Sequence, residues 1–298
     1  MTTAPLSSAI NDVDRAPAIS AAVVAFPSAL PRRIDFGRIA ASLARTLVPP
    51  LVMLAIILVV WQVACSGPNA TLPPPSQVWM ESGDLIMSPF YNNGDADVGL
   101  GWRIISSLQR VAFGFGLAAV AGVVLGAIVG QSVWAMRGLD PIFQILRTVP
   151  PLAWLPLSLA AFRDSHPAAI FVIFITSIWP VIINTAVGVR QIPDDYRNVA
   201  RILQLNPLEF FFKIMVPSAA PYIFTGLRIG VGLSWLAIVA AEMLTGGVGI
   251  GFFIWDAWNS SHLPDIIVAL VYIGVVGFLL DRLVAGIGAF VTRGTSAK

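Results

Sequence analysis

The sequence is poor in charge and in the residues that build catalytic or metal centres. Of its 298 residues only 11% are Asp, Glu, Lys or Arg, whereas 57% are hydrophobic. Soluble domains contain about 25% charged residues, so a soluble surface is excluded. Cys65 is the only cysteine, and the two histidines, His166 and His262, lie far apart. An internal disulfide and a cysteine metal cluster are therefore excluded, and we predict no metal site. The net charge of +2 gives no indication of nucleic acid binding.

Two nucleotide and enzyme signatures are also missing. The chain has no G-x-x-x-x-G-K-[ST] phosphate loop, and its glycine cluster at residues 246–251 is not followed by Lys-Ser or Lys-Thr. It has no cluster of His, Asp, Cys or Ser near a membrane interface, which a membrane enzyme would need. We predict that the chain is not an enzyme and that any ATP hydrolysis belongs to another subunit.

Apolar runs of about 20 residues recur along the chain, the length needed to cross a ~30 Å hydrocarbon core as a helix. A transmembrane barrel would instead show alternating segments of about 10 residues. We predict an all-α polytopic membrane protein with six transmembrane helices. The expected spans are residues 46–65, 102–130, 141–162, 167–189, 214–241 and 264–290. The third is interrupted by Pro150, Pro151 and Pro156.

The residues before the first span form a separate region. We expect residues 1–30, rich in Ala, Ser and Pro, to be a flexible tail. Residues 31–45 carry four arginines among apolar residues, which is typical of an interfacial helix. No apolar run follows the start directly, so we expect no cleaved signal. Residues 46–298 form the transmembrane domain.

Lys and Arg predict the orientation, because they concentrate in cytosolic segments. The N-terminal tail, the C-terminus and the loop at residues 190–213 are basic, whereas the loops at 66–101 and 245–263 contain no Lys or Arg. Arg163, between the third and fourth spans, is the one exception. We therefore expect both termini and the loop at 190–213 in the cytosol.

That loop contains the polar stretch NVARILQLNPLEFFFKIMVP at residues 198–217. Pro193 followed by two aspartates is typical of a helix start, so we expect a helix over residues 194–205. Pro207 ends that helix and starts a second one, with Glu209 in its first turn. The residues alone leave two interpretations open: an ordinary loop, or a docking helix for a soluble partner.

The loop resembles the EAA loop of permease subunits of ATP-binding-cassette importers. Ala200 matches the second alanine of that motif, and Ile214, Val216 and Pro217 have the spacing of its Ile-x-Leu-Pro end. The motif's glutamate, first alanine and glycine are replaced by Asn198, Val199 and Gln204. Four further segments resemble the nitrate, bicarbonate and aliphatic-sulfonate branch: residues 107–126, 146–157, 226–244 and 246–259. Residues 167–189 look most like the nitrate and bicarbonate members.

The resemblance implies a type I importer permease in a bacterial inner membrane, working by alternating access. It implies a second permease copy, cytosolic ATPase subunits that bind ATP and Mg²⁺, and a periplasmic or lipid-anchored solute-binding protein. No cofactor is expected in this chain. Nitrate or nitrite is the expected solute, with bicarbonate or taurine and other aliphatic sulfonates as alternatives. An ion-coupled secondary transporter would show inverted repeats, which the two halves of the chain lack.

Two sets of site residues follow. The resemblance implies an ATPase-coupling loop containing Asn198, Ala200, Arg201, Leu205, Pro207, Phe211 and Pro217. Charges inside spans are costly and are functional by default, so Arg228 and Glu242 are pathway candidates, together with Ser234 and Trp235. A structural alternative stays open for Arg228, which can bond to a neighbouring helix, and Glu242 can order an outer loop or gate. Glycines at spacing four, at 122, 126 and 130 and at 226 and 230, predict close helix packing.

Overall fold

The computed structural model describes residues 36–68, 70–94 and 97–293. Regular structure in these residues is helical, apart from one isolated antiparallel bridge between Asn92 and Val98. The helices are α1 (Phe36–Cys65), α2 (Pro75–Met87), α3 (Leu100–Gln131), α4 (Val133–Leu146), α5 (Pro151–Phe162), α6 (Ser165–Arg190), α7 (Asp194–Ile202), α8 (Pro207–Phe210), the π-helix η1 (Phe211–Met215), α9 (Val216–Thr245), α10 (Ile250–Asn259) and α11 (Leu263–Thr292). The predicted all-α fold is confirmed.

The chain divides into two parts, residues 1–56 and 57–298, and each is described by itself. The tail expected at residues 1–30 lies outside the described residues, as does the start of the interfacial helix. From Phe36 onward, α1 is one continuous helix that runs through Pro49 and Pro50. Its apolar side chains between Leu47 and Ile56 are exposed. A helix that is apolar on all sides needs lipid or another subunit around it.

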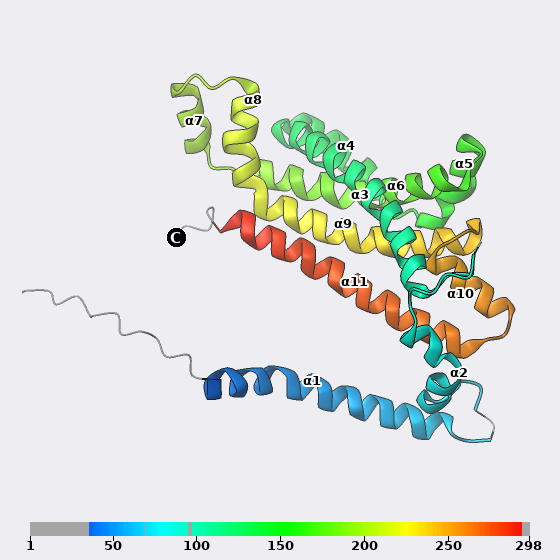
Figure 1. Ribbon diagram of the computed structural model, residues 1–298. Helices are drawn as coiled ribbons and strands as arrows, with labels where there is room; N and C mark the ends of the chain where they lie inside the picture. Colours follow the sequence, from blue (N-terminus) through cyan, green and yellow to red (C-terminus); the bar gives the residue numbers. More distant parts are fainter. Residues whose placement is uncertain (1–35, 69, 95–96, 294–298) are drawn as a thin grey trace, which may run out of the picture. The chain divides into compact units, whose positions relative to one another are not determined.

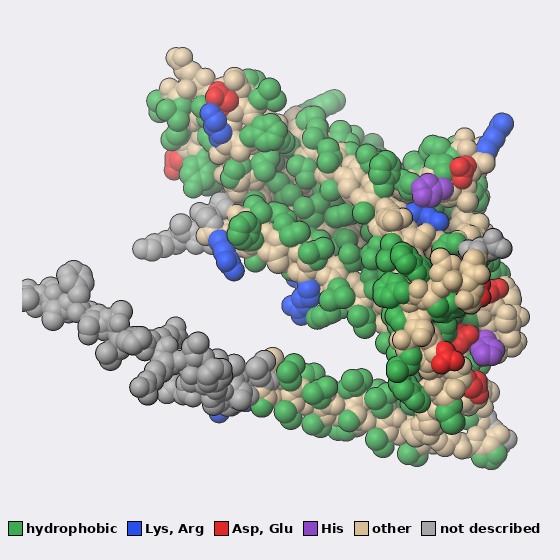
Figure 2. Space-filling model, viewed as in Figure 1, with side chains coloured by type: hydrophobic (Ala, Val, Ile, Leu, Met, Phe, Trp, Pro, Cys, Tyr) green, Lys and Arg blue, Asp and Glu red, His purple; other side chains and the backbone are tan. Residues whose placement is uncertain are grey.

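The second part is built around α6, which packs along its length against α3 and α9 (Figure 1). α11 packs against α9, so these four long helices lie side by side. The pair α7 and α8 lies at one end of them, and α2, α5 and α10 lie toward the other end. Figure 2 shows hydrophobic side chains along the helices, with most acidic side chains near the two ends. This distribution matches a body surrounded by hydrocarbon.

Glycines explain how closely the helices approach. A Cβ added at Gly122 would lie 2.7 Å from Cγ1 of Val181, and one at Gly126 would lie 2.7 Å from the carbonyl oxygen of Ile182. A Cβ at Gly226 would lie 2.8 Å from the carbonyl oxygen of Pro180. These contacts are shorter than any side chain tolerates, so the predicted packing faces of α3 and α9 are confirmed.

Among the described residues, five helices are long and apolar enough to cross a membrane, and α4 with α5 forms a sixth span if the bent pair counts as one. The structure differs here from the single span expected at residues 141–162. α4 already begins at Val133, and the chain bends by 93° between the two helices. The break falls at Pro150 and Pro151, because a proline removes a backbone donor and disfavours helix at the residue before it.

Two further helices lie in segments expected to be loops. α2 follows the proline run at residues 73–75 and packs against α11, where Ser82 Oγ donates to Asp265 Oδ1 at 2.5 Å. α10 packs against α9 and α11. The end of the bundle that carries them is therefore capped by ordered helices.

Candidate functional site

The polar segment between α6 and α9 folds as a helical hairpin. α7 begins after Pro193 with Asp194 and Asp195 in its first turn, as the sequence predicts. It ends at Ile202, three residues earlier than expected, because the chain reverses at Gln204. We call α7, α8 and the turn between them, residues 194–210, the hairpin.

Gln204 has a φ of 49°, in the left-handed region that glycine favours. It occupies the position at which the EAA motif carries glycine. A positive φ gives a physical reason for a glycine at that position, and this chain makes its turn there with a side chain present. The backbone N–H of Leu205 then closes the turn by donating to the carbonyl of Ala200 at 3.1 Å.

The second arm of the hairpin starts at Pro207, as predicted, and its first turn is a capping box. The backbone N–H of Glu209 donates to Asn206 Oδ1 at 2.8 Å, and the N–H of Asn206 donates to Glu209 Oε2 at 3.1 Å. Lys213 Nζ donates to Glu209 Oε1 at 2.8 Å. The backbone N–H groups of Asn206 and Glu209 thus both have acceptors, which gives the second arm a defined start.

The second arm continues into α9 without a loop. The π-turn of η1 follows α8 directly and leads into α9, so the chain stays helical from Pro207 to Thr245. Pro217 lies at the start of α9, directly after the π-turn. A displacement of the hairpin is therefore carried into a membrane-spanning helix.

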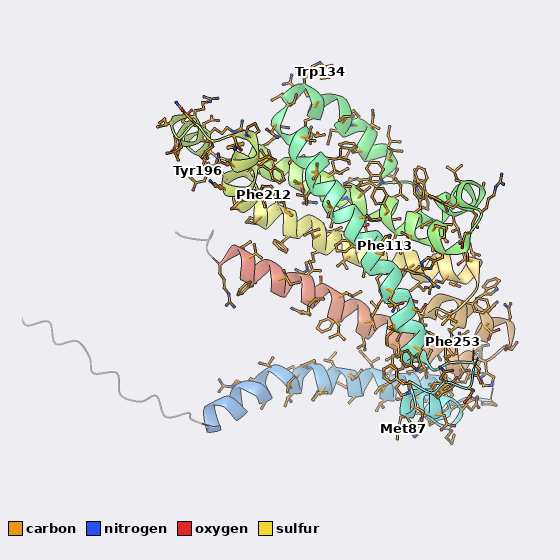
Figure 3. The ribbon with its side chains drawn as sticks, turned by 45° about the horizontal axis from the view of Figure 1, so that its top comes forward. Met87, Phe113, Trp134, Tyr196, Phe212 and Phe253 are labelled. Carbon is orange, nitrogen blue, oxygen red and sulfur yellow. The ribbon has the colours of Figure 1, made fainter. Side chains whose placement is uncertain are left out.

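α7 has two different faces. Its outer stripe is apolar and exposed, with 79% of Ile202 and 62% of Leu203 accessible. Tyr196 and Val199 extend this stripe at helical spacing, and Figure 3 shows Tyr196 projecting from the hairpin. We call Tyr196, Val199, Ile202 and Leu203 the outer stripe. An exposed apolar stripe on a polar helix is typical of a protein–protein contact.

The inner face of α7 borders a cavity of about 660 Å³ between the hairpin, the ends of α3 and α6, and η1. Of the seven residues predicted for coupling, five line this cavity: Ala200, Arg201, Leu205, Pro207 and Phe211. Asn198 is exposed and accepts from Arg201 Nη1 at 3.3 Å. The sequence reasoning missed Ile202 and Leu203, although their spacing from Tyr196 and Val199 gives the signal of an amphipathic helix.

At the opposite end of α9, Glu242 is the centre of a buried hydrogen-bond network. Its side chain, 1% exposed, accepts from Arg110 Nη1 at 2.6 Å and from Ser107 Oγ at 2.8 Å, both on α3. It also accepts from the backbone N–H of Gly251 at 3.1 Å, and Ser107 Oγ accepts from the N–H of Ile250 at 3.1 Å. The network joins α3, α9 and the start of α10, so Glu242 holds the loop at residues 246–249 in place.

Arg228, near the middle of α9, forms a two-pronged ion pair with Asp281 on α11. Nη2 lies 2.8 Å from Oδ2, and Nε bonds to Oδ1. The pair explains how a charge is tolerated in an apolar helix, as the structural alternative for Arg228 anticipated.

Ser234 and Trp235 are buried between helices. Ser234 Oγ donates to the carbonyl of Gly230 at 2.9 Å, and Trp235 Nε1 donates to the carbonyl of Ile273 on α11 at 3.0 Å. Both polar groups are therefore satisfied inside the protein. The four pathway candidates follow α9 from Arg228 to Glu242 and do not converge on one point, and their role in transport stays a prediction. Among the described residues, no group of three His, Cys, Asp or Glu is placed to hold a metal ion.

The fold and the hairpin define a class. It is a multi-span helical membrane protein with a polar helical hairpin between two of its long apolar helices. The chain matches a solved structure, the inward-facing MetNI methionine ABC transporter, with a TM-score of 0.58 over 65% of this chain and 96% of that one. The two are 16% identical, so this likeness shows the fold alone.

Sequence comparison identifies the family. Residues 118–293 match the model of the binding-protein-dependent transport system inner membrane component, and the chain belongs to this family. It is 61% identical to the nitrate import permease protein NrtB of Synechocystis sp. over 79% of this chain and 86% of that protein. It is 52% identical to the bicarbonate transport system permease protein CmpB of the same organism, over 83% of this chain and 90% of that protein. The chain is thus a multi-pass inner membrane component that works with partner proteins.

Proposed function

We propose that this chain is the permease subunit of an ATP-driven importer for nitrate or nitrite. The assignment of the solute rests on the comparison with two proteins of Synechocystis sp. The nitrate permease is 61% identical to this chain, and the bicarbonate permease is 52% identical. Bicarbonate is the second candidate, because that match also spans most of the chain. Aliphatic sulfonates such as taurine are a third, from the sequence resemblance alone.

The orientation follows from the placement of Lys and Arg. The hairpin carries Arg197 and Arg201, and Arg190 and Lys213 flank it, whereas the loops around α2 and α10 carry no Lys or Arg. By the positive-inside rule, the hairpin lies in the cytosol and the capped end with α2 and α10 lies outside a bacterial inner membrane. Both termini are then cytosolic.

Each end has its own partner. The outer stripe of α7 fits a groove on a cytosolic ATPase, because it offers apolar side chains on a short rigid helix. The ATPase binds ATP and Mg²⁺, and this chain supplies no part of the nucleotide site. A second copy of the chain completes the pathway. A periplasmic or lipid-anchored binding protein docks at the end formed by α2 and α10.

The continuous helix from Pro207 to Thr245 supports alternating access. When ATP binding closes the two ATPase subunits on each other, the outer stripes of the two permease copies follow the subunits to which they are docked. The hairpin has no flexible link to α9, so this movement tilts or shifts α9 within the bundle. The Glu242 network ties the far end of α9 to α3 and α10, so that the same movement reaches the outer end.

The docking assignment is tested by adding a charge to the outer stripe. The Ile202→Asp and Leu203→Asp variants should insert into membranes and fold, but should no longer copurify with the ATPase, because a carboxylate would be buried in an apolar contact. Leu208→Asp is the matched control: it places the same charge at an exposed apolar residue of the second arm, outside the outer stripe. Copurification of both stripe variants at wild-type yield would refute the assignment.

The solute is tested by uptake. A strain that lacks the gene and is complemented with it should accumulate ¹⁵N-nitrate from the medium, and ¹³C-bicarbonate uptake should equal that of the empty strain. Restored bicarbonate uptake without nitrate uptake would replace nitrate by the second candidate. Restored taurine uptake alone would select the third.

A further inference from the structure

The break between α4 and α5 places an arginine, Arg147, at mid-depth in the bundle. The cavity beside it is lined by Thr176 and Trp179, near the centre of α6, and by Leu233, near the centre of α9. In membrane proteins, non-helical backbone at this depth is tolerated where it is buried or lines a cavity. Broken helices at the midplane also form the solute sites of many transporters of other families.

The cavity at the break measures about 320 Å³, toward the lower end of the range of about 300–1,000 Å³ for small-molecule sites. Its polar and aromatic lining consists of Arg147, Thr148, Trp154, Thr176, Trp179 and Asn184. No Asp or Glu is among the described residues that line it. The cavity is therefore a small compartment whose one charged side chain is positive.

Arg147, in the turn that follows α4, differs from Arg110 on α3 and Arg228 on α9. Arg110 pairs with Glu242, and Arg228 pairs with Asp281. The Arg147 side chain makes no ion pair, hydrogen bond or ring contact within the part of the chain that the structure describes. Its side chain is exposed in the single chain, at the turn between α4 and α5, and an arginine at such a depth in a membrane needs an acid, a carbonyl or a ligand. Its five N–H groups are available to a molecule in the cavity.

Two neighbouring polar side chains are fixed by hydrogen bonds to carbonyls of α6. Thr176 Oγ1 donates to the carbonyl of Val172 at 2.6 Å, and Asn184 Nδ2 donates to the carbonyl of Pro180 at 2.8 Å. The second amide hydrogen of Asn184 is therefore free to bind a molecule in the cavity. The indole N–H groups of Trp154 and Trp179 make no hydrogen bond to other described residues. Unused donors around an unpaired positive charge select an anion.

We propose that this cavity binds the small oxyanion that the permease carries, with the Arg147 guanidinium as its charge partner. The proposal rests on the proposed function. A planar oxyanion accepts two parallel N–H bonds from a guanidinium, which no ammonium group reproduces. The aromatic and aliphatic walls exclude bulky solutes. A site at this depth holds the anion halfway between the two ends of the bundle.

The experiment measures binding to the permease–ATPase complex in nanodiscs, without the binding protein. Equilibrium dialysis against ¹⁵N-nitrate should show saturable binding to the wild type. Arg147→Gln should weaken binding at least tenfold, and Arg147→Lys should restore it in part. Arg137→Gln is the matched control, since it removes an arginine outside the cavity, from α4, the helix that ends directly before Arg147. It should bind as the wild type does.

A second variant covers the case in which Arg147→Gln fails to assemble. Asn184→Asp places a carboxylate in the cavity, where it gives Arg147 the acid that it lacks and repels an anion. It should assemble and lose nitrate binding. Wild-type binding by Arg147→Gln or by Asn184→Asp overturns the site and indicates that a lipid phosphate or an acid of the second copy satisfies Arg147.

Failure of the site and failure of the proposed function give different results. If the wild type carries nitrate but its complex binds none, or binds it independently of Arg147, the site alone is wrong. If the wild type carries bicarbonate instead, the nitrate assignment is wrong. The same dialysis with ¹³C-bicarbonate then decides the site by the same criterion.

Discussion

Gln204 occupies the glycine position of the EAA motif but carries a side chain there. Its φ of 49° is unfavourable for a residue with a Cβ, by about 1–2 kcal/mol relative to the right-handed region. Pro207 and the capping box after it hold the turn in place all the same. The turn is therefore maintained by its neighbours, and the side chain of Gln204 is a local cost.

Replacing Gln204 by glycine should stabilise the hairpin. Because glycine adopts a positive φ without strain, Gln204→Gly should gain about 1 kcal/mol and raise the thermal unfolding midpoint of the purified permease by a few degrees. Gln204→Ala is the control, since it removes the long side chain but keeps the Cβ. Equal midpoints for the glycine and alanine variants would show that the backbone is not strained.

Glu242 is the residue on which the far end of α9 depends. Glu242→Ala leaves Arg110 without its acid and the N–H of Gly251 without an acceptor, so we expect a loss on the order of 3–5 kcal/mol. Glu242→Gln keeps an acceptor for that N–H and should lose less. Thermal unfolding in detergent measures both, and an alanine variant as stable as the wild type would contradict the structural role.

At the scale of the element, the contact between α3 and α6 sets the position of the coupling apparatus. The small residues of α3 let the two backbones come close, and α6 leads directly into the hairpin. A side chain at these positions must push the helices apart, because the nearest atoms include backbone oxygens that have no room to move.

Substitutions at two glycines of α3, one inside this contact and one outside it, test the contact. Gly126→Leu should prevent a stable fold, since its Cβ alone would lie 2.7 Å from the carbonyl oxygen of Ile182. Gly116→Leu on the same helix is the matched control, because a Cβ there meets nothing within 4 Å. Monodisperse elution from a sizing column in detergent reports the fold. A monodisperse Gly126→Leu variant would show that the contact is adaptable.

The elements themselves differ in how far the sequence predicts them. The long spans follow from hydropathy and length, and the hairpin follows from Pro193, Pro207 and the acids beside them. α2 and α10 were not predicted, because each is too short or too mixed in polarity to stand out from a loop. The 93° bend between α4 and α5 depends on packing that prolines permit but do not specify.

For the whole molecule, the orientation in the membrane decides which partner can reach which end of the bundle. Cysteine labelling tests this orientation. In a Cys65→Ala background, which leaves no cysteine, a membrane-impermeant maleimide should label a Met80→Cys variant on α2 from outside the cell. It should label an Asp195→Cys variant on the hairpin only after the membrane is opened. The reverse pattern would place the hairpin outside and exclude its contact with a cytosolic ATPase.

The sequence by itself determined that this protein is a helical membrane protein, and its loop spacing pointed to the family that comparison then confirmed. Hydropathy and the spacing of prolines and glycines are local properties, so they can be read without a fold. Only the tertiary structure decided which face of α7 is outward and which acids pair with Arg110 and Arg228. It also decided that Arg147 lies beside a cavity and has no acidic partner among the described residues. Those answers depend on helices that are far apart in the chain, because burial and pairing are set by what packs against each side chain.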